Sequence, residues 1–169
     1  MITFKTILLT TDFSAYSDAA IPYAGELGRK YSGTIRLLHV FDDMPPAPGI
    51  GSEIYMPFDW IDAARKERLA RLANLVEKIS MDEKVEVQPR LREGIAHQGI
   101  VDEAKECHAD CIVIATHGRT GIPHFLFGSI AENVVRRSTC PVLTIRPAKI
   151  EIDKTPVKDL EMVQHCPAL

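Results

Sequence analysis

Short apolar stretches alternate with helical patterns along most of the chain, and this alternation strongly limits the possible folds. Alternating strands and helices are typical of βαβ units, whose strands run parallel and whose right-handed crossovers place helices on both faces of the sheet. We therefore predict an α/β fold with a doubly wound, five-stranded parallel sheet of Rossmann-like or flavodoxin-like type. The predicted strands are 7–10, 34–40, 85–91, 111–115 and 141–145, and the predicted helices are about 15–31, 58–80, 95–106 and 129–137.

Several residues refine this pattern. Pro22 lies inside the first predicted helix, where it either kinks the helix or marks a first turn that starts later. Ser14 is the expected N-cap of that helix. Pro89 places the strand at 85–91 at an edge of the sheet. The helix at 58–80 has an apolar face whose only polar member is Arg68.

The length and the net charge of the chain limit the number of domains and the kinds of partner that it can have. The 169 residues suit one domain plus a tail, and residues 148–169 are charged, contain prolines and show no periodicity. We predict a domain at 1–147 and a C-terminal tail at 148–169. The net charge of −3 and the lack of a basic run give no support to nucleic-acid binding. No apolar stretch reaches the roughly 20 residues that span a bilayer, and no signal peptide is visible, so we expect a soluble, cytoplasmic protein with no membrane partner.

The four cysteines are expected to be reduced thiols. Cys107 and Cys111 flank His108 and Asp110, which raises the question of a metal site. No accompanying ligand set with metal-binding spacing is present, so ordinary half-buried thiols are the favoured interpretation.

The segment between the fourth predicted strand and the last helix carries the clearest functional signal. Ala115-Thr116-His117-Gly118 ends the strand, and nine residues separate Gly118 from Gly128-Ser129. Glycine lets the backbone approach a ligand closely, and the free N–H groups at a helix start attract phosphate. Ser129 and Glu132 have the spacing of a capping box. We favour a phosphate site here over glycines that only shape a turn.

A second loop is expected to face the same crevice. If the first and fourth strands are neighbours where the strand order reverses, both of their carboxyl ends border one ligand site. Asp12 then either holds a ribose hydroxyl, or a magnesium ion through a phosphate, or it only caps the first helix. The backbone at 39–41 is placed to grip a base edge, and Arg119 and Ser129 to contact phosphate oxygens, with local solvated or capping roles as the alternatives.

Several enzyme motifs are absent from the sequence. There is no P-loop, no dinucleotide fingerprint after the first strand and no nucleophile elbow. No catalytic triad or carboxylate pair can be recognised. Nothing in the sequence supplies a general base, so any enzymatic activity is at most that of a slow ATPase.

Three stretches of the chain resemble the universal stress protein (UspA-like) family. They are the opening strand and loop at 7–14, the second strand at 37–40, and the C-terminal signature from 115–118 through 128–134 to 140–143. The similarity covers roughly residues 3–147. It implies an adenine-nucleotide alpha-hydrolase-like fold and a homodimer made by antiparallel pairing of Val142–Ile145, an edge that would otherwise stand open.

The resemblance also implies a nucleotide site. The ATP-binding branch carries G-x2-G-x9-G-[ST], and here Ala115 stands in place of the first glycine. Asp12 and Val40 are implied near the ribose and adenine, and the glycine-loop residues around the phosphates. The predicted cofactor is ATP or a related adenine nucleotide, with magnesium at Asp12 through the nucleotide. The predicted cofactor-binding residues are Thr10, Thr11, Asp12, Val40, Ile114, Ala115, Gly118, Arg119, Gly128, Ser129 and Ile130.

These observations favour a nucleotide-binding regulatory homodimer in the stress response. The alternative is a nucleotide-free, chaperone-like dimer that acts through protein contacts. Ala115 leaves room for that alternative, because its methyl group stands where the backbone should pass close to the nucleotide.

Overall fold

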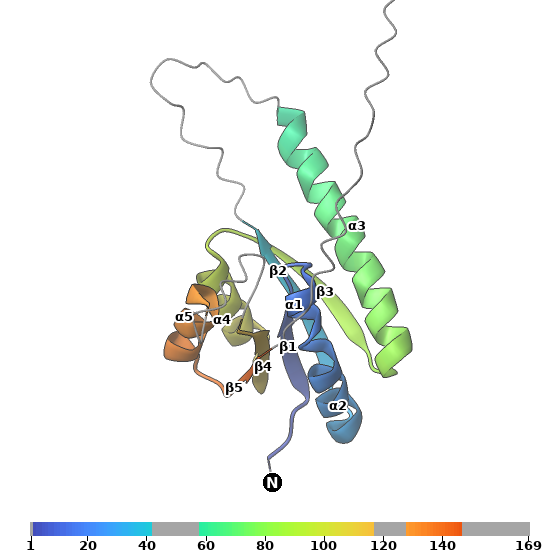
Figure 1. The fold of residues 1–169 in the computed structure, drawn as a ribbon, viewed down its shortest axis with the longest axis vertical. Coiled ribbons are helices and arrows are strands. Elements are labelled where there is room, and N and C mark those ends of the chain that lie inside the picture. Colours follow the sequence, from blue (N-terminus) through green and yellow to red (C-terminus); the bar gives the residue numbers. More distant parts are fainter. Residues whose placement is uncertain (1, 42–57, 117–127, 147–169) are drawn as a thin grey trace, which may run out of the picture.

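A single parallel sheet organises the protein, as the computed structural model of residues 2–41, 58–116 and 128–146 shows. The sheet has five strands in the order β3-β2-β1-β4-β5, with helices on both faces (Figure 1). This confirms the predicted doubly wound α/β fold, and the order is that of a Rossmann-type sheet. The elements are β1 (Thr6–Thr10), α1 (Ala15–Asp18), α2 (Ile21–Tyr31), β2 (Thr34–Phe41), α3 (Phe58–Glu83), β3 (Val87–Glu93), α4 (Ala96–Glu106), β4 (Cys111–Ala115), α5 (Ser129–Arg137) and β5 (Val142–Ile145).

Different helices cover the two faces of the sheet. Because successive side chains of a strand point to opposite faces, Leu8 packs on one side of β1 while Ile7 and Leu9 pack on the other. Leu8 belongs to a buried cluster with residues of α4 and α5, and Ile7 and Leu9 belong to a cluster with residues of α2 and α3. Both clusters are fully apolar, and they hold the helices in the positions that frame the site described below.

The first predicted helix is two helices. α1 ends at Asp18, α2 begins at Ile21, and Pro22 lies in the first turn of α2, which proline tolerates. The second alternative for Pro22 is therefore correct. Ala20 and Ala24 are buried, whereas Tyr23 is 52% exposed.

β3 is an edge strand, as Pro89 predicts, although it begins two residues later than expected. The preceding helix, α3, continues past residue 80 because neither glycine nor proline interrupts it. It ends at Glu83, and the next residue, Lys84, adopts a left-handed backbone with φ of 54°. Within the described residues, no helix is both long enough and apolar enough to cross a bilayer.

Candidate functional site

A cavity of about 380 Å³ opens at the carboxyl ends of the strands. β1 and β4 pair in parallel, with Leu8 opposite Ile112, so the two loops expected to share a crevice do so. Strand order reverses at this point, which is where doubly wound sheets bind ligands. The volume falls in the range of roughly 300–1,000 Å³ typical of small-molecule sites.

All of the predicted site residues that the structure describes line this cavity. Gly118 and Arg119 lie outside the described residues, as does His117. The residues placed on the cavity wall are Thr10, Thr11, Asp12, Val40, Ile114, Ala115, Gly128, Ser129 and Ile130.

A tight turn after β1 presents Asp12 to the cavity. One carboxylate oxygen of Asp12, Oδ1, accepts hydrogen bonds from the backbone N–H and the hydroxyl of Ser14. Phe13 between them has φ of 62°, an uncommon conformation for a residue with a large side chain. Ser14 in turn caps α1, because its hydroxyl accepts from the backbone N–H of Ser17 at 3.2 Å. Ser14 is thus the helix cap, as predicted, and Asp12 stabilises the turn.

A second acid lies close to this turn. The pKa of Asp18 is raised, mainly because burial penalises its charged form. Lys78 opposes this shift and the negative charge of Asp12 adds to it. Asp18 itself does not line the cavity. Among the described residues, no group of three or more His, Cys, Asp or Glu side chains is arranged to hold a metal ion by itself.

The opposite wall is the start of α5, and here one expectation is wrong. Gly128, not Ser129, is the N-cap: its carbonyl accepts from the N–H of Glu132 at 3.0 Å. The helix therefore starts one residue earlier than a Ser129–Glu132 capping box requires, and no side chain caps it. Because the first N–H groups of a helix have no acceptor within it, the first turn of α5 presents backbone donors at the cavity wall.

Gly128 is also held against the end of β4. Its N–H donates to the carbonyl of Thr116 at 2.7 Å. A Cβ at this position would lie only 2.9 Å from that carbonyl oxygen, closer than real Cβ contacts allow. The close approach of these two backbone segments explains why glycine stands here.

A third wall is apolar and comes from β2, β4 and α4. Val40, Ile100 and Ile114 line it. α4 can approach β2 because residue 99 is glycine, where a Cβ would lie 2.9 Å from a methyl carbon of Val40.

An ion-pair cluster also ties α4 to the sheet. Glu103 is only 4% exposed. Its carboxylate forms ion pairs with the guanidinium groups of Arg92 from β3, at 2.9 Å, and of Arg36 from β2, at 3.3 Å. Arg90 contributes a third contact at 3.4 Å. The buried carboxylate therefore fixes the rotation of α4, on which the apolar wall depends.

Sequence reasoning missed the remaining end of the cavity, formed by Arg68, Phe41 and the ring of His39. The guanidinium of Arg68, from α3, lies 4.7 Å from the centre of the Phe41 ring. His39 is buried, and its Nδ1 donates a hydrogen bond of 2.8 Å to the carbonyl of Thr11. The signal in the sequence was the single polar residue on the apolar face of α3.

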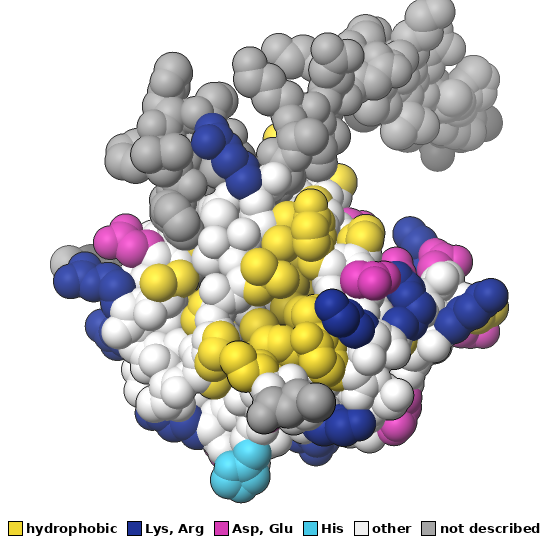
Figure 2. All heavy atoms as spheres, turned by 90° about the horizontal axis from the view of Figure 1, so that it is seen from below, with side chains coloured by type: hydrophobic (Ala, Val, Ile, Leu, Met, Phe, Trp, Pro, Cys, Tyr) yellow, Lys and Arg dark blue, Asp and Glu magenta, His cyan; other side chains and the backbone are white. Residues whose placement is uncertain are grey.

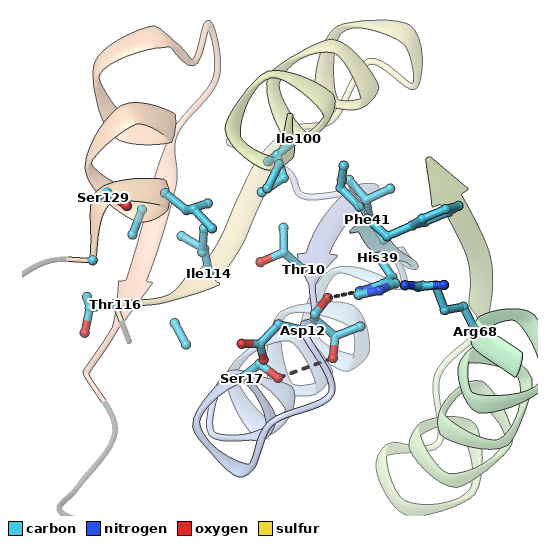
Figure 3. Close-up of a pocket in the computed structure, with 18 residues that line it drawn as sticks. Thr10, Asp12, Ser17, His39, Phe41, Arg68, Ile100, Ile114, Thr116 and Ser129 are labelled. Carbon is cyan, nitrogen blue, oxygen red and sulfur yellow. Dashed lines mark hydrogen bonds between the residues drawn. The ribbon is translucent and has the colours of Figure 1, made fainter. Parts of the chain in front are cut away.

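These walls meet around Asp12. In Figure 3, Ser129 and Arg68 lie on opposite sides of the cavity, Asp12 and Thr10 lie between them, and Ile100 lies in a third direction. The cavity thus has an N–H-rich end, an apolar end and an arginine end. This arrangement can accommodate a ligand with an anionic group, an apolar ring and a polar centre that joins them.

Known proteins are similar to this chain in sequence and in fold. The universal stress protein MJ0531 of Methanocaldococcus jannaschii is 29% identical over 148 residues, which cover 88% of this chain and 85% of the relative. The solved structure of MJ0577 is 27% identical, with a TM-score of 0.71, and covers 88% of this chain and 100% of its own.

Two further structures share the fold at lower identity. A universal stress protein in complex with cAMP is 20% identical with a TM-score of 0.61, and it covers 86% of this chain and 99% of its own. One from Archaeoglobus fulgidus in complex with dAMP is 24% identical with a TM-score of 0.57, over the same shares of both chains. The model of the universal stress protein family itself matches residues 3–146. The chain therefore belongs to the universal stress protein family.

Proposed function

We propose that this protein binds ATP or a related adenine nucleotide in the cavity at the ends of β1, β2 and β4. One observation carries the proposal: the first turn of α5 has no side-chain cap, and Gly128, Ser129 and Ile130 line the cavity at the point where strand order reverses. Such a helix start favours the negative charge of a phosphate through its N–H groups and its dipole.

The other walls suit the rest of a nucleotide. Asp12, between the two ends, is placed to accept hydrogen bonds from the ribose hydroxyls. The apolar wall at Val40, Ile100 and Ile114 suits the adenine ring, with the backbone of Val40 at its edge. Magnesium would enter with the phosphates and meet Asp12. The complexes of other universal stress proteins with cAMP and dAMP support a ligand of this class.

The cheapest test is to look for nucleotide that remains bound during purification. The protein is denatured, and the released small molecules are identified by chromatography and mass spectrometry. Protein stripped of nucleotide is then titrated with ATP and magnesium by calorimetry, with GTP as the control for the base. We expect binding of ATP at one site per chain and a rise in melting temperature. The absence both of a heat of binding and of a shift in melting temperature at millimolar ATP would contradict the proposal.

We also propose a regulatory homodimer that pairs through β5, in a domain at 1–147 with the tail at 148–169 outside it. β5 is an edge of the sheet, and Leu143 in it is 36% exposed. Pairing two such edges satisfies their free N–H and C=O groups. Figure 2 shows a hydrophobic area, with charged side chains along one side of it, on the face seen from below, and exposed hydrophobic areas often mark interaction sites.

Light scattering on the unmodified protein tests the assembly. We expect the mass of a dimer at micromolar concentration, and a monomeric mass would contradict the pairing. A dimer that carries no nucleotide and binds none would instead favour the alternative function, a dimer that acts through protein contacts alone.

A further inference from the structure

The proposed mode of nucleotide binding assigns no contact to the arginine end of the cavity. The 5′-phosphates would occupy the first turn of α5, and the base would occupy the apolar wall around Ile100. The ribose at Asp12 would then lie at the junction, with the third direction leading to Arg68 (Figure 3). The substituents of the ribose that point neither to the base nor to the 5′-phosphates are those at its 2′ and 3′ positions.

The side chain of Arg68 packs against a set of aromatic rings. Its guanidinium lies 4.7 Å from the centre of the Phe41 ring, and Phe41 is stacked with His39 at 6.3 Å with an angle of 14° between the rings. His39 is fixed by its hydrogen bond to the carbonyl of Thr11, next to Asp12. His39 also contacts the ring of Phe13, whose centre is 4.3 Å from that of His39. A guanidinium supported in this way loses little freedom when it binds an anion.

The chemistry of this end is that of a phosphate subsite. Guanidinium groups bind phosphate through two parallel N–H···O bonds, and partial burial strengthens such charge-assisted bonds. Arg68 is half-buried on the cavity wall.

We infer that Arg68 forms a second anion subsite, which takes a phosphate carried on the 2′ or 3′ oxygen of the bound nucleotide's ribose, while the other of these two oxygens keeps its hydroxyl and donates to Asp12. This inference rests on the proposed function, because it needs the ribose at Asp12. It names a narrower class of ligand, adenine nucleotides phosphorylated on both sides of the ribose.

The test compares three ligands by calorimetry on protein stripped of nucleotide: AMP, adenosine 3′,5′-bisphosphate and adenosine 2′,5′-bisphosphate. One additional charge-assisted contact should raise the affinity of at least one bisphosphate over that of AMP by about tenfold or more. The isomer that gains shows which ribose oxygen faces Arg68. We expect Arg68→Gln to lower this ratio to about one, and Arg68→Lys, which keeps the charge without the planar fork, to keep part of it.

Arg65→Gln is the matched control. Arg65 lies one turn earlier on α3, is 58% exposed, and pairs with Glu93 outside the cavity. Its substitution removes the same charge from the same helix, and the ratio should not change. Melting temperatures without ligand show whether each variant is folded.

The outcomes separate the two proposals. Equal affinity for AMP and both bisphosphates, or a preference that survives Arg68→Gln, overturns the subsite and leaves the proposed function standing. If neither AMP nor a bisphosphate binds, the proposed function fails and the subsite fails with it. A preference for a bisphosphate that Arg68→Gln abolishes and Arg65→Gln keeps supports the subsite.

Discussion

The closest packing at the proposed phosphate site is between Gly128 and Thr116, and a side chain at position 128 perturbs it in a predictable way. Gly128 has φ of −70° and ψ of 150°, which any residue adopts, so a substitution causes no backbone strain. Its effect must therefore come from space. A Cβ at 2.9 Å from the Thr116 oxygen has to retreat by about 0.5 Å to reach the 3.4 Å of ordinary contact.

This movement has two consequences. It stretches the hydrogen bond between the N–H of Gly128 and the carbonyl of Thr116, now 2.7 Å, so Gly128→Ala should lower the free energy of unfolding by about 1 kcal/mol. Gly128→Val adds two methyl groups at the cavity wall and displaces the first-turn N–H groups. Loss of two charge-assisted bonds at roughly 1.5–3 kcal/mol each should weaken ATP binding by a factor of 100 or more.

The assay is calorimetric titration with ATP together with thermal unfolding of each variant. Gly28→Ala in α2 is the matched control, because a Cβ there meets a methyl carbon of Val85 at 3.0 Å and does not line the cavity. It should cost stability without loss of affinity. If Gly128→Val binds ATP as tightly as the parent, phosphate does not lie at the start of α5 and the reasoning is refuted.

Three further substitutions test Asp12 and two residues that lie outside the cavity lining, Asp18 and Glu103. Asp12→Ala should reduce both melting temperature and ATP affinity; a loss of stability alone would show that Asp12 only supports its turn. Burial raises the pKa of Asp18 above its ordinary value of 3.8, with Lys78 opposing this shift and Asp12 adding to it. Protonation of Asp18 therefore stabilises the fold, and this contribution is complete only at pH values below 3.8. This stabilisation is lost as pH rises through the raised value, so Asp18→Asn should raise the melting temperature at about pH 7 and lose that advantage in acid, and an equal gain at all pH values would contradict the shift. Glu103→Ala should cost roughly 3 kcal/mol, near the lower end of values for a broken buried pair because its arginines are partly exposed, as measured by denaturant unfolding; a cost under about 1 kcal/mol would show that the cluster does not hold α4.

The sheet could be predicted from the sequence because its strands are buried and short. Continuous apolar runs such as 111–115 have few alternatives, and the helices between them dictate parallel pairing. The placement of Asp12 and Gly128 around one cavity follows from the same logic, because Asp12 follows β1 and Gly128 is held against the end of the neighbouring strand β4.

Details that depend on backbone geometry or on tertiary packing could not be predicted. The break between α1 and α2 is one such detail, because Pro22 is compatible both with a kinked helix and with the first turn of a new one. The cap of α5 moved from Ser129 to Gly128 because the contact with Thr116 sets the entry of the chain. Arg68 reaches the cavity only because α3 packs beside the end of β2, and no local pattern encodes which helix lies there.

The two edges of the sheet differ in what they permit. β3 carries Pro89, which lacks a backbone N–H, and its arginines belong to ion pairs, whereas β5 presents short apolar residues such as Leu143. Strand addition at β3 would meet a missing donor and a desolvation penalty for the arginines. A sheet that can pair through only one of its edge strands has no further edge to offer once that strand is paired. If copies of this chain join through β5 as proposed, we therefore expect the assembly to stop at two chains and not to extend into a fibre, so concentration would change the fraction of paired protein but not the size of the assembly.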